Sequence, residues 1–201
     1  PAVASRTQDT LTISWQKWSP QAGSGVSSVH SYVIRVWQQD GQPSNVTVPS
    51  ENNTATIINL SHYTEYNVSV IIWNNAGYYG LPSPTTTART CGEPVAPPNP
   101  NVNSFFDLSQ RSTYMEIKTM GMNQEIHRCD WFAKLTVRYE GEFNNGTTDV
   151  LRVNESQLIT ITNLTANSTY TIYLTAVNNL LLVGPPLTVT HTTTEGGNFF
   201  N

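Results

Sequence analysis

The sequence predicts an all-β protein made of two tandem seven-stranded β-sandwiches. Three observations predict this fold: short runs of alternating apolar and polar residues, turn signals between the runs, and a second copy of the pattern about 104 residues later. The expected domains span residues 1–90 and 91–195, and residues 196–201 form a tail.

In the first half, apolar and polar residues alternate along five stretches, as expected for strands with one buried face. These stretches are residues 11–15, 32–36, 46–48, 55–57 and 66–72, and a last, proline-edged strand is expected over 82–88. Turn residues separate them, for example Asp40-Gly41 and the loop 74–80. Short strands at this spacing are typical of a β-sandwich.

The second half repeats the first. Met115 and Ile117 match Leu11 and Ile13 at an offset of 104, and the segment 159–174 matches 55–70 at the same offset. An offset of one domain length, sustained over the chain, indicates a tandem domain rather than a solenoid of short repeats.

The composition excludes several classes of partner. Charged residues make up 12% of the chain and the net charge is −4, so the chain lacks the basic stripe that binds nucleic acid and the basic patch that binds anionic membranes. No run of about 20 apolar residues occurs, so no membrane contact is expected from this segment.

Glycosylation sequons indicate the compartment. The chain has eight Asn-X-Ser/Thr sequons: Asn45, Asn52, Asn59, Asn67, Asn145, Asn154, Asn163 and Asn167. Together with two cysteines that can pair, they favour an extracellular location. The alternative is a cytosolic β protein in which the sequons are accidental.

A repeated Leu-x5-Tyr pattern carries a family resemblance. Leu60…Tyr66 and Leu164…Tyr170, with Trp15, Tyr32 and Asn-Asn-Ala-Gly in the loop 74–80, resemble the fibronectin type III domain, an immunoglobulin-like sandwich. The resemblance implies that Tyr66 and Tyr170 form tyrosine corners, in which the hydroxyl bonds back to the preceding loop. The second copy departs from it, because Thr119 stands where Trp15 would project. Trp131 or Phe132 is expected to fill that space.

The two cysteines are interpreted as a disulfide between Cys91 and Cys129. No Cys-x2-Cys or His pair accompanies them, as a zinc site would require, and His127 is too close in sequence to Cys129 to form a catalytic dyad. In a sandwich of this type, the start of the first strand and the loop 121–128 lie at the same end, within reach of a bridge. Free or intermolecular thiols are the alternative.

An apolar loop in the second half predicts an interdomain contact. Leu180, Leu181, Leu182 and Val183 follow one another where a loop is expected, and an exposed loop is rarely so apolar. We expect this loop to pack near His62 and Tyr63 of the first domain. In the alternative reading, some of these residues point into the second domain's own core.

The cysteine pattern also resembles consecutive repeats of receptor-type protein tyrosine phosphatases of the MAM-containing adhesive branch. The resemblance implies the ectodomain of a type I plasma-membrane receptor whose catalytic part lies outside this chain. Two alternatives are a cytokine-receptor module, suggested by Cys129-Asp130-Trp131, and a spacer of a secreted matrix protein. Arg-Gly-Asp, the integrin-binding motif, is absent.

No enzyme is predicted in this segment, and no cofactor or metal. No Cys-x5-Arg phosphatase loop occurs, the four histidines are scattered, and the pair Glu140 and Glu142 is interpreted as solvated. The expected partner is a protein, including a second copy of the chain. Tyr78 and Tyr79, in the loop 74–80, are the candidate binding residues, with the alternative that Tyr78 caps the sandwich.

Overall fold

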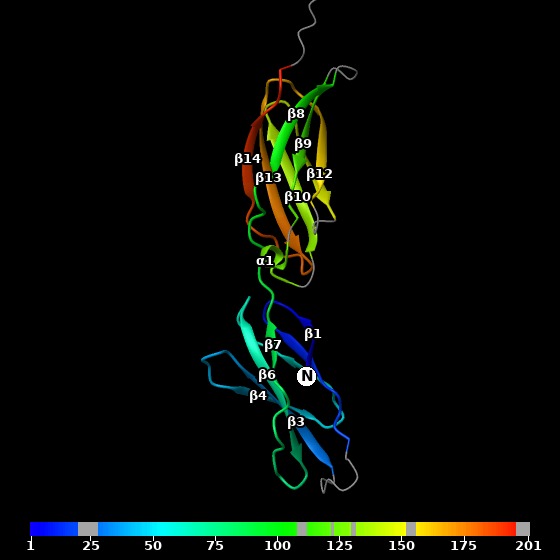
Figure 1. Ribbon diagram of the computed structural model, residues 1–201, viewed down its shortest axis with the longest axis vertical. Helices are drawn as coiled ribbons and strands as arrows, with labels where there is room; N and C mark the ends of the chain where they lie inside the picture. The colour runs from blue at the N-terminus through cyan, green and yellow to red at the C-terminus, as the bar shows by residue number, and fades with distance from the viewer. Residues whose placement is uncertain (20–27, 108–111, 122, 130–131, 152–155, 196–201) are drawn as a thin grey trace, which may run out of the picture. The chain divides into compact units, whose positions relative to one another are not determined.

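The computed structural model describes residues 1–19, 28–107, 112–121, 123–129, 132–151 and 156–195. The chain divides into two compact units, Pro1–Gly92 and Glu93–Asn201 (Figure 1). The boundary predicted from the sequence lies two residues earlier, after residue 90.

The first unit is a sandwich of a three-stranded and a four-stranded antiparallel sheet. The strand order is β1-β2-β5 in one sheet and β4-β3-β6-β7 in the other. The strands are β1 Ala2–Arg6, β2 Leu11–Ser14, β3 Val29–Trp37, β4 Ser44–Pro49, β5 Thr54–Ile57, β6 Glu65–Asn74 and β7 Thr86–Arg89. All five interior stretches predicted from apolar alternation coincide with strands.

The second unit repeats this arrangement, with the order β8-β9-β12 in one sheet and β11-β10-β13-β14 in the other. Its elements are β8 Asn101–Asp107, β9 Ser112–Lys118, α1 Gln124–His127, β10 Phe132–Gly141, β11 Asn145–Val150, β12 Leu158–Leu164, β13 Thr169–Asn178 and β14 Leu187–Thr192. The predicted fold class, two tandem seven-stranded sandwiches, is confirmed.

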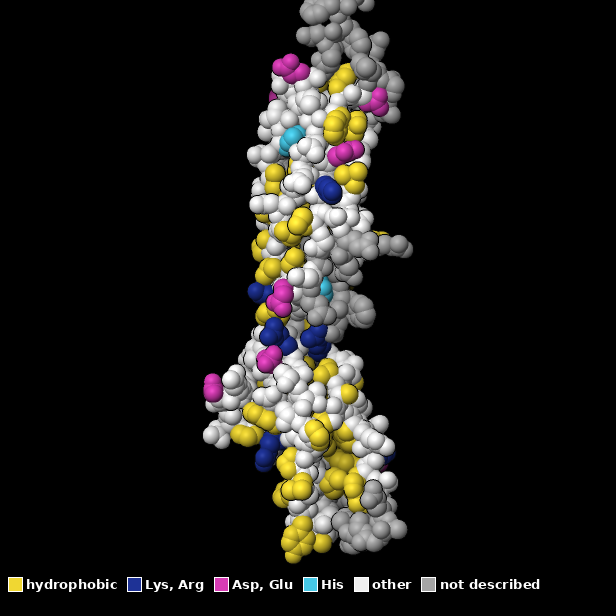
Figure 2. Space-filling model, in the orientation of Figure 1, with side chains coloured by type: hydrophobic (Ala, Val, Ile, Leu, Met, Phe, Trp, Pro, Cys, Tyr) yellow, Lys and Arg dark blue, Asp and Glu magenta, His cyan; other side chains and the backbone are white. Residues whose placement is uncertain are grey.

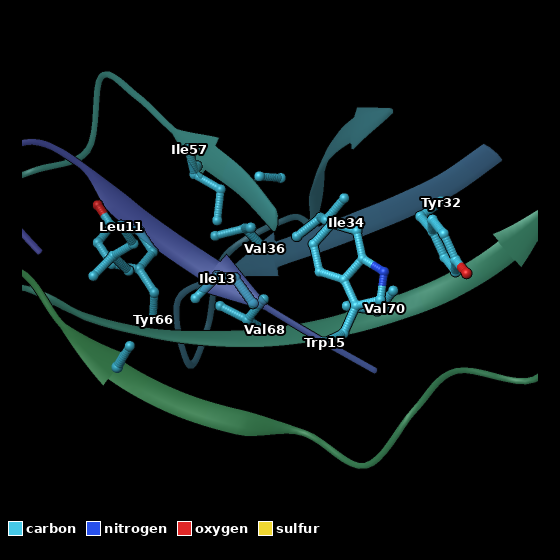
Figure 3. Close-up of a cluster of buried hydrophobic side chains, with 12 residues drawn as sticks. Leu11, Ile13, Trp15, Tyr32, Ile34, Val36, Ile57, Tyr66, Val68 and Val70 are labelled. Atoms are coloured by element: carbon cyan, nitrogen blue, oxygen red, sulfur yellow. The ribbon is translucent and has the colours of Figure 1, made fainter. Parts of the chain in front are cut away.

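The core of the first unit consists of side chains that project inward from both sheets (Figure 3). Leu11, Ile13 and Ile34 are completely buried, as the alternation along their strands predicts. Trp15 lies against Tyr32, with ring centroids 5.3 Å apart, and the backbone N–H of Trp18 donates to the Tyr32 hydroxyl at 2.9 Å. The two aromatic rings close the core at one end of the sandwich.

The second unit fills this end of its core differently. Thr119, at the position of Trp15, is buried, and its hydroxyl accepts a hydrogen bond from the backbone N–H of Gln157 at 3.2 Å. Ile126, from helix α1, packs against the core cluster. Trp131 and the side chain of Phe132, which were expected to fill the space, lie outside the described residues. The helix was also not predicted, because residues 121–128 read as a loop.

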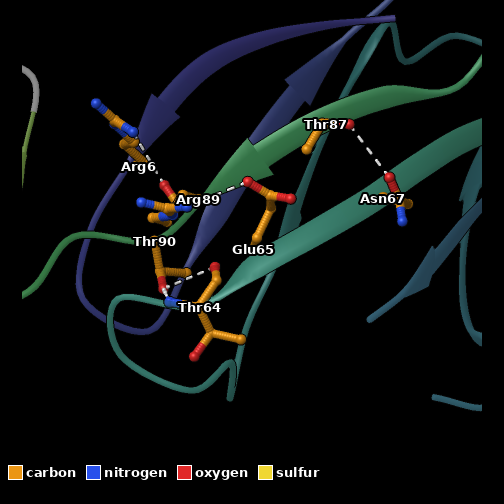
Figure 4. Close-up of polar contacts among 7 residues, drawn as sticks. All are labelled: Arg6, Thr64, Glu65, Asn67, Thr87, Arg89 and Thr90. Carbon is orange, nitrogen blue, oxygen red and sulfur yellow. Dashed lines mark hydrogen bonds and ion pairs between the residues drawn. The ribbon is translucent and has the colours of Figure 1, made fainter. Parts of the chain in front are cut away.

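A threonine after the last strand of each unit holds the turn before β6 or β13. The Thr90 hydroxyl accepts from the backbone N–H of Thr64 at 3.0 Å (Figure 4). It also donates to the carbonyl of Ser61 at 2.6 Å. Thr193 makes the equivalent bonds to Ser168 and Thr165, at 3.0 and 2.6 Å. The turn and the end of the last strand are therefore fixed together in both units.

The sequence pattern did not locate strand β1 among the seven expected strands, because nearly all of its residues are exposed and it lacks apolar alternation. Its pairing with β2 is made by main-chain hydrogen bonds, which leave little trace in side-chain pattern. The Thr86 hydroxyl also donates to the carbonyl of Pro1 at 2.7 Å, which links this edge to β7.

Candidate binding surface

The loop that follows β6 in the first unit is held in a defined conformation. The side-chain oxygen of Asn74 accepts hydrogen bonds from the backbone N–H groups of Ala76 and Tyr78, at 3.0 and 2.9 Å. Gly77 has φ = +84°, a conformation that glycine adopts at little cost. The loop presents Tyr78 with 71% of its surface exposed and Tyr79 with 64% exposed. Tyr78 therefore does not cap the sandwich.

Tyr79 belongs to an aromatic group on the outer face of the four-stranded sheet. Its ring stacks on Trp73 with centroids 5.8 Å apart, and His30 meets the other side of Trp73 edge-on at 4.9 Å. The indole N–H of Trp73 is buried and has no hydrogen-bond partner in the described part of the chain. We refer to His30, Trp73, Tyr78, Tyr79 and Leu81 as the loop-end surface; Leu81 is 93% exposed.

Hydrophobic side chains gather over this end of the first unit (Figure 2). Next to it lies a cavity of about 570 Å³ with a mixed polar and apolar lining, to which Trp15, Trp18, Tyr32, Ile72 and Leu81 contribute. The indole N–H of Trp15 is buried without a partner among the described residues. Exposed tyrosine and apolar side chains beside such a cavity are typical of a surface that binds protein.

The corresponding loop of the second unit uses the same asparagine. The side-chain oxygen of Asn178 accepts from the backbone N–H groups of Leu180 and Leu182, at 3.0 and 3.2 Å. Leu181 has φ = +61°, where the first unit has Gly77, and it is 73% exposed. An exposed leucine in a left-handed conformation is costly for stability.

The two corner tyrosines are anchored in the same way. The Tyr66 hydroxyl accepts hydrogen bonds from the backbone N–H of Ser61 at 2.9 Å and from the side-chain amide of Gln38 at 3.2 Å. Burial acts to raise the pKa of Tyr66, but these donors favour the phenolate and the net effect lowers the pKa. The Tyr170 hydroxyl accepts from the backbone N–H of Thr165 at 3.0 Å and donates to the side-chain oxygen of Asn144.

Replacing Tyr66 by phenylalanine is expected to destabilise the first unit by about 1–2 kcal/mol, because the Ser61 N–H loses its acceptor. Tyr170→Phe should have an effect of similar size on the second unit, since Thr165 loses the same acceptor. Urea denaturation monitored by circular dichroism measures both. Tyr78→Phe, at an exposed hydroxyl, is the matched control, and equal stability of all three variants would contradict the expectation.

Both cysteines of the chain are in disulfide linkage. Cys91 is completely buried; its N–H donates to the carbonyl of Thr7 at 2.8 Å, and its carbonyl accepts from Tyr63 at 3.0 Å. Cys129 is 2% exposed. The Cys129-Asp130-Trp131 motif extends beyond the described residues, because Asp130 and Trp131 are not described.

The residues predicted to form an interdomain contact lie as follows. His62 is exposed, and Tyr63 is half-buried, with the Arg89 guanidinium 5.1 Å from its ring centroid. In the second unit, Leu180 and Leu182 are half-buried, whereas Leu181 and Val183 are exposed. A contact between these two groups stays a prediction.

Seven of the eight sequon asparagines lie in the described part of the chain, and Asn154 lies outside it. Asn59, Asn163 and Asn167 have φ between +48° and +61°. Asparagine tolerates this conformation better than most residues, so the backbone alone accounts for its presence there. Asn45, Asn52 and Asn145 are exposed, and Asn67 is half-buried on β6.

Glu140 is engaged with neighbouring side chains of the same sheet. Glu140 is bound to the Arg138 guanidinium at 3.0 Å and accepts from the Tyr173 hydroxyl at 3.1 Å, which leaves Glu142 outside this group.

His191 bonds to the Ser104 hydroxyl at 3.0 Å, and burial lowers the pKa of its imidazole. Among the described residues, no three His, Cys, Asp or Glu side chains are grouped as a metal site, and no helix is long and apolar enough to cross a bilayer.

Residues 2–89 match the family model of the fibronectin type III domain. The first unit is a fibronectin type III domain. The second unit has the same strand order in both sheets, so the chain consists of two tandem β-sandwiches of the same fold. Fibronectin type III domains are binding and spacer modules that are typical of extracellular adhesion proteins and receptors.

Many solved structures are similar to the chain, and two of them illustrate the match. The FN1–FN3 domains of chicken contactin CNTN1 are 20% identical, with a TM-score of 0.47 over 96% of this chain. A two-domain fibronectin type III segment of chicken tenascin is 14% identical, with a TM-score of 0.43 over 96% of this chain and 97% of that segment. The chain spans 65% of the contactin fragment. Comparison with curated proteins gives no match.

Sequence reasoning identified Tyr78 and Tyr79 but missed three other members of the loop-end surface, His30, Trp73 and Leu81. Trp73 occupies an outward position in the alternation of β6, and a large aromatic residue on an outward face is the signal that could have identified it. Its stacking with Tyr79 depends on a bridge between the two backbones, which the sequence does not reveal.

Proposed function

We infer that the chain is an extracellular binding and spacer module of a cell-surface adhesion or signalling receptor. The fibronectin type III fold supports a module of this class, and the disulfide supports an oxidising compartment. The observation that carries the binding role is the exposed aromatic group at the loop end of the first domain.

The partner is a protein, and it contacts the loop-end surface. Tyr78 and Leu81 project from a loop whose backbone is already fixed by Asn74, so little conformational entropy is lost when they become buried. Tyr79 is held by stacking on Trp73, and tyrosine is among the residues that contribute most to protein interfaces. A second copy of this chain is one such partner.

The spacer role rests on the connection between the two domains. Cys91 is bonded by its main chain to Thr7 and Tyr63 of the first unit, while Val95 donates to the carbonyl of Ile126 in the second unit at 2.8 Å. Few residues are left between these anchored positions. We infer that the Cys91–Cys129 disulfide stiffens this connection, with His62, Tyr63 and the loop 180–183 in contact around it.

A more specific proposal is that the parent protein is a receptor-type tyrosine phosphatase of the MAM-containing adhesive branch. It rests on the positions of Cys91 and Cys129 alone. Catalysis would then belong to a cytoplasmic domain outside this chain, and this segment would bind the ligand. The coding sequence that follows residue 201 tests this proposal directly, because it would encode a transmembrane helix and a phosphatase domain.

The binding role is tested by presenting the chain as a tetramer to an array of cell-surface ectodomains that includes the chain itself. Tyr79→Ala and Tyr78→Ala are expected to weaken binding about tenfold or more each, the effect of losing a central aromatic contact. Phe143→Ala, which removes a 67% exposed aromatic side chain from the second domain, is the matched control. Binding that survives both tyrosine changes but is lost with Phe143 would contradict the assignment.

A further inference from the structure

A polar hollow of about 620 Å³ lies at one edge of the four-stranded sheet of the first domain. Its walls are the turn between β3 and β4 and the start of β6: Gln38, Gln39, Asp40, Gly41, Glu65 and Asn67. The side chains of Gln39 and Asp40 take part in no hydrogen bond or ion pair with other described residues. Glu65 is paired with Arg89 at 3.3 Å. The hollow therefore offers free amide and carboxylate groups and little apolar surface.

Asn67 is the sequon asparagine that borders this hollow. Asparagine is disfavoured in β-strands, yet Asn67 lies within β6, paired with Trp37 on one side and Thr87 on the other. A positive φ angle explains why asparagine is found at Asn59, Asn163 and Asn167. Asn67 does not have a positive φ angle, so this explanation does not apply to it.

The side chain of Asn67 is held in one orientation. The Thr87 hydroxyl donates to its Oδ1 at 3.2 Å, and Figure 4 shows Nδ2 on the opposite side of the amide, turned away from Thr87. Nδ2 is therefore on the side of β6 where β3 lies. Trp37 of β3 is paired with Asn67, and both side chains lie on the outer surface of the sheet. Residues directly opposite one another in an antiparallel pair have Cβ atoms about 5 Å apart. Trp37 is only half-buried, so part of its ring is open to a neighbouring group.

We propose that Asn67 carries an N-linked glycan whose first two N-acetylglucosamine residues are seated in this hollow, beside the Trp37 ring. In the transfer, Nδ2 loses a proton and bonds to C1 of the first sugar. The bond from C1 to the phosphate oxygen of a lipid-pyrophosphate-linked oligosaccharide breaks, and the lipid pyrophosphate leaves. The apolar face of the sugar then covers Trp37, and its hydroxyl and acetamido groups bond to Gln39 and Asp40. The glycan thereby fixes the turn between β3 and β4.

This inference rests on the extracellular assignment made above, and the experiment separates the two. The chain is secreted from a glycosylating host, and sequon occupancy is determined by peptide mass spectrometry. An endoglycosidase that cuts between the two core N-acetylglucosamines is then applied to the folded protein. Asn52, an exposed sequon in the same domain, provides the matched control.

Cleavage at Asn67 is expected to be about tenfold slower than at Asn52 in the folded protein, and equal after unfolding, because the seated linkage must open first. Trp37→Leu should abolish the difference. Asn67→Gln should lower the melting temperature by about 4 °C, and Asn52→Gln should not change it.

The outcomes are distinct. A bare Asn67 in a protein whose other sequons are occupied overturns the seated glycan and leaves the extracellular assignment intact. Equal cleavage rates at Asn67 and Asn52, with no loss of melting temperature in Asn67→Gln, also overturn it. A secreted protein with every sequon bare counts against the extracellular assignment as well as the glycan.

Discussion

Replacing Cys91 and Cys129 together by serine is expected to lower the free energy of unfolding of the second domain by about 4 kcal/mol, the value for closing a loop of this length in the chain-entropy model. The loop between the two cysteines contains β8 and β9, which are two of the three strands of one sheet of that domain, and the helix α1. Without the bond, the unfolded chain gains freedom in the whole segment. Differential scanning calorimetry should show a melting transition roughly 15 °C lower for this domain.

Two controls accompany this variant. Reduction of the unmodified protein should reproduce the loss, because it breaks the same bond without changing any side-chain volume. The first domain, reported by the fluorescence of Trp15 and its neighbours, should melt within a few degrees of its original temperature. Equal stability of the oxidised protein and the double serine variant would contradict the account.

Gly141→Ala is expected to destabilise the second domain by about 3 kcal/mol, at the upper end of the range for overpacking. Gly141 is paired across the sheet with Tyr170, and a Cβ atom at Gly141 would lie 2.6 Å from Cδ1 of the Tyr170 ring. The ring has no room to move, because Tyr170 is completely buried and its hydroxyl is bonded on both sides. Chemical denaturation measures the loss.

Gly41→Ala in the first domain is the matched control. A Cβ atom there would lie 3.5 Å from its nearest neighbour, in ordinary van der Waals contact, so stability should change little. The two domains differ at this corner. In the first domain the Gln38 side chain donates a hydrogen bond to the Tyr66 hydroxyl. In the second domain Gly141 has no side chain and leaves room for the Tyr170 ring, and Asn144 accepts a hydrogen bond from the Tyr170 hydroxyl. A stable Gly141→Ala protein would show that the Tyr170 ring is not tightly held.

Much of the fold could be predicted from the sequence, because burial imposes a period of two on each interior strand. Ile34, Val36, Val68 and Val70 alternate with outward residues, and this pattern repeats one domain later. The exposed edge strand β1 and the helical turn α1 left no such pattern. The contact of Ile126 with the core therefore became visible only in the structure.

The candidate binding surface was less predictable. Tyr78 and Tyr79 stand out in a loop sequence, but their different roles depend on the backbone. The bridge between Trp73 and Tyr79 pairs those two rings and leaves Tyr78 projecting freely. The hollow beside Asn67 brings together residues 38–41 and 65–67, which are distant in sequence and meet only because β3 pairs with β6.

We infer that this chain is a disulfide-bonded, glycosylated extracellular module. Non-reducing peptide mapping of the protein secreted from a glycosylating host tests it most directly. We expect a linked peptide pair that contains Cys91 and Cys129, and an oligosaccharide on Asn67. Recovery of both cysteines as free thiols, with Asn67 and the other sequon asparagines unmodified, would contradict it.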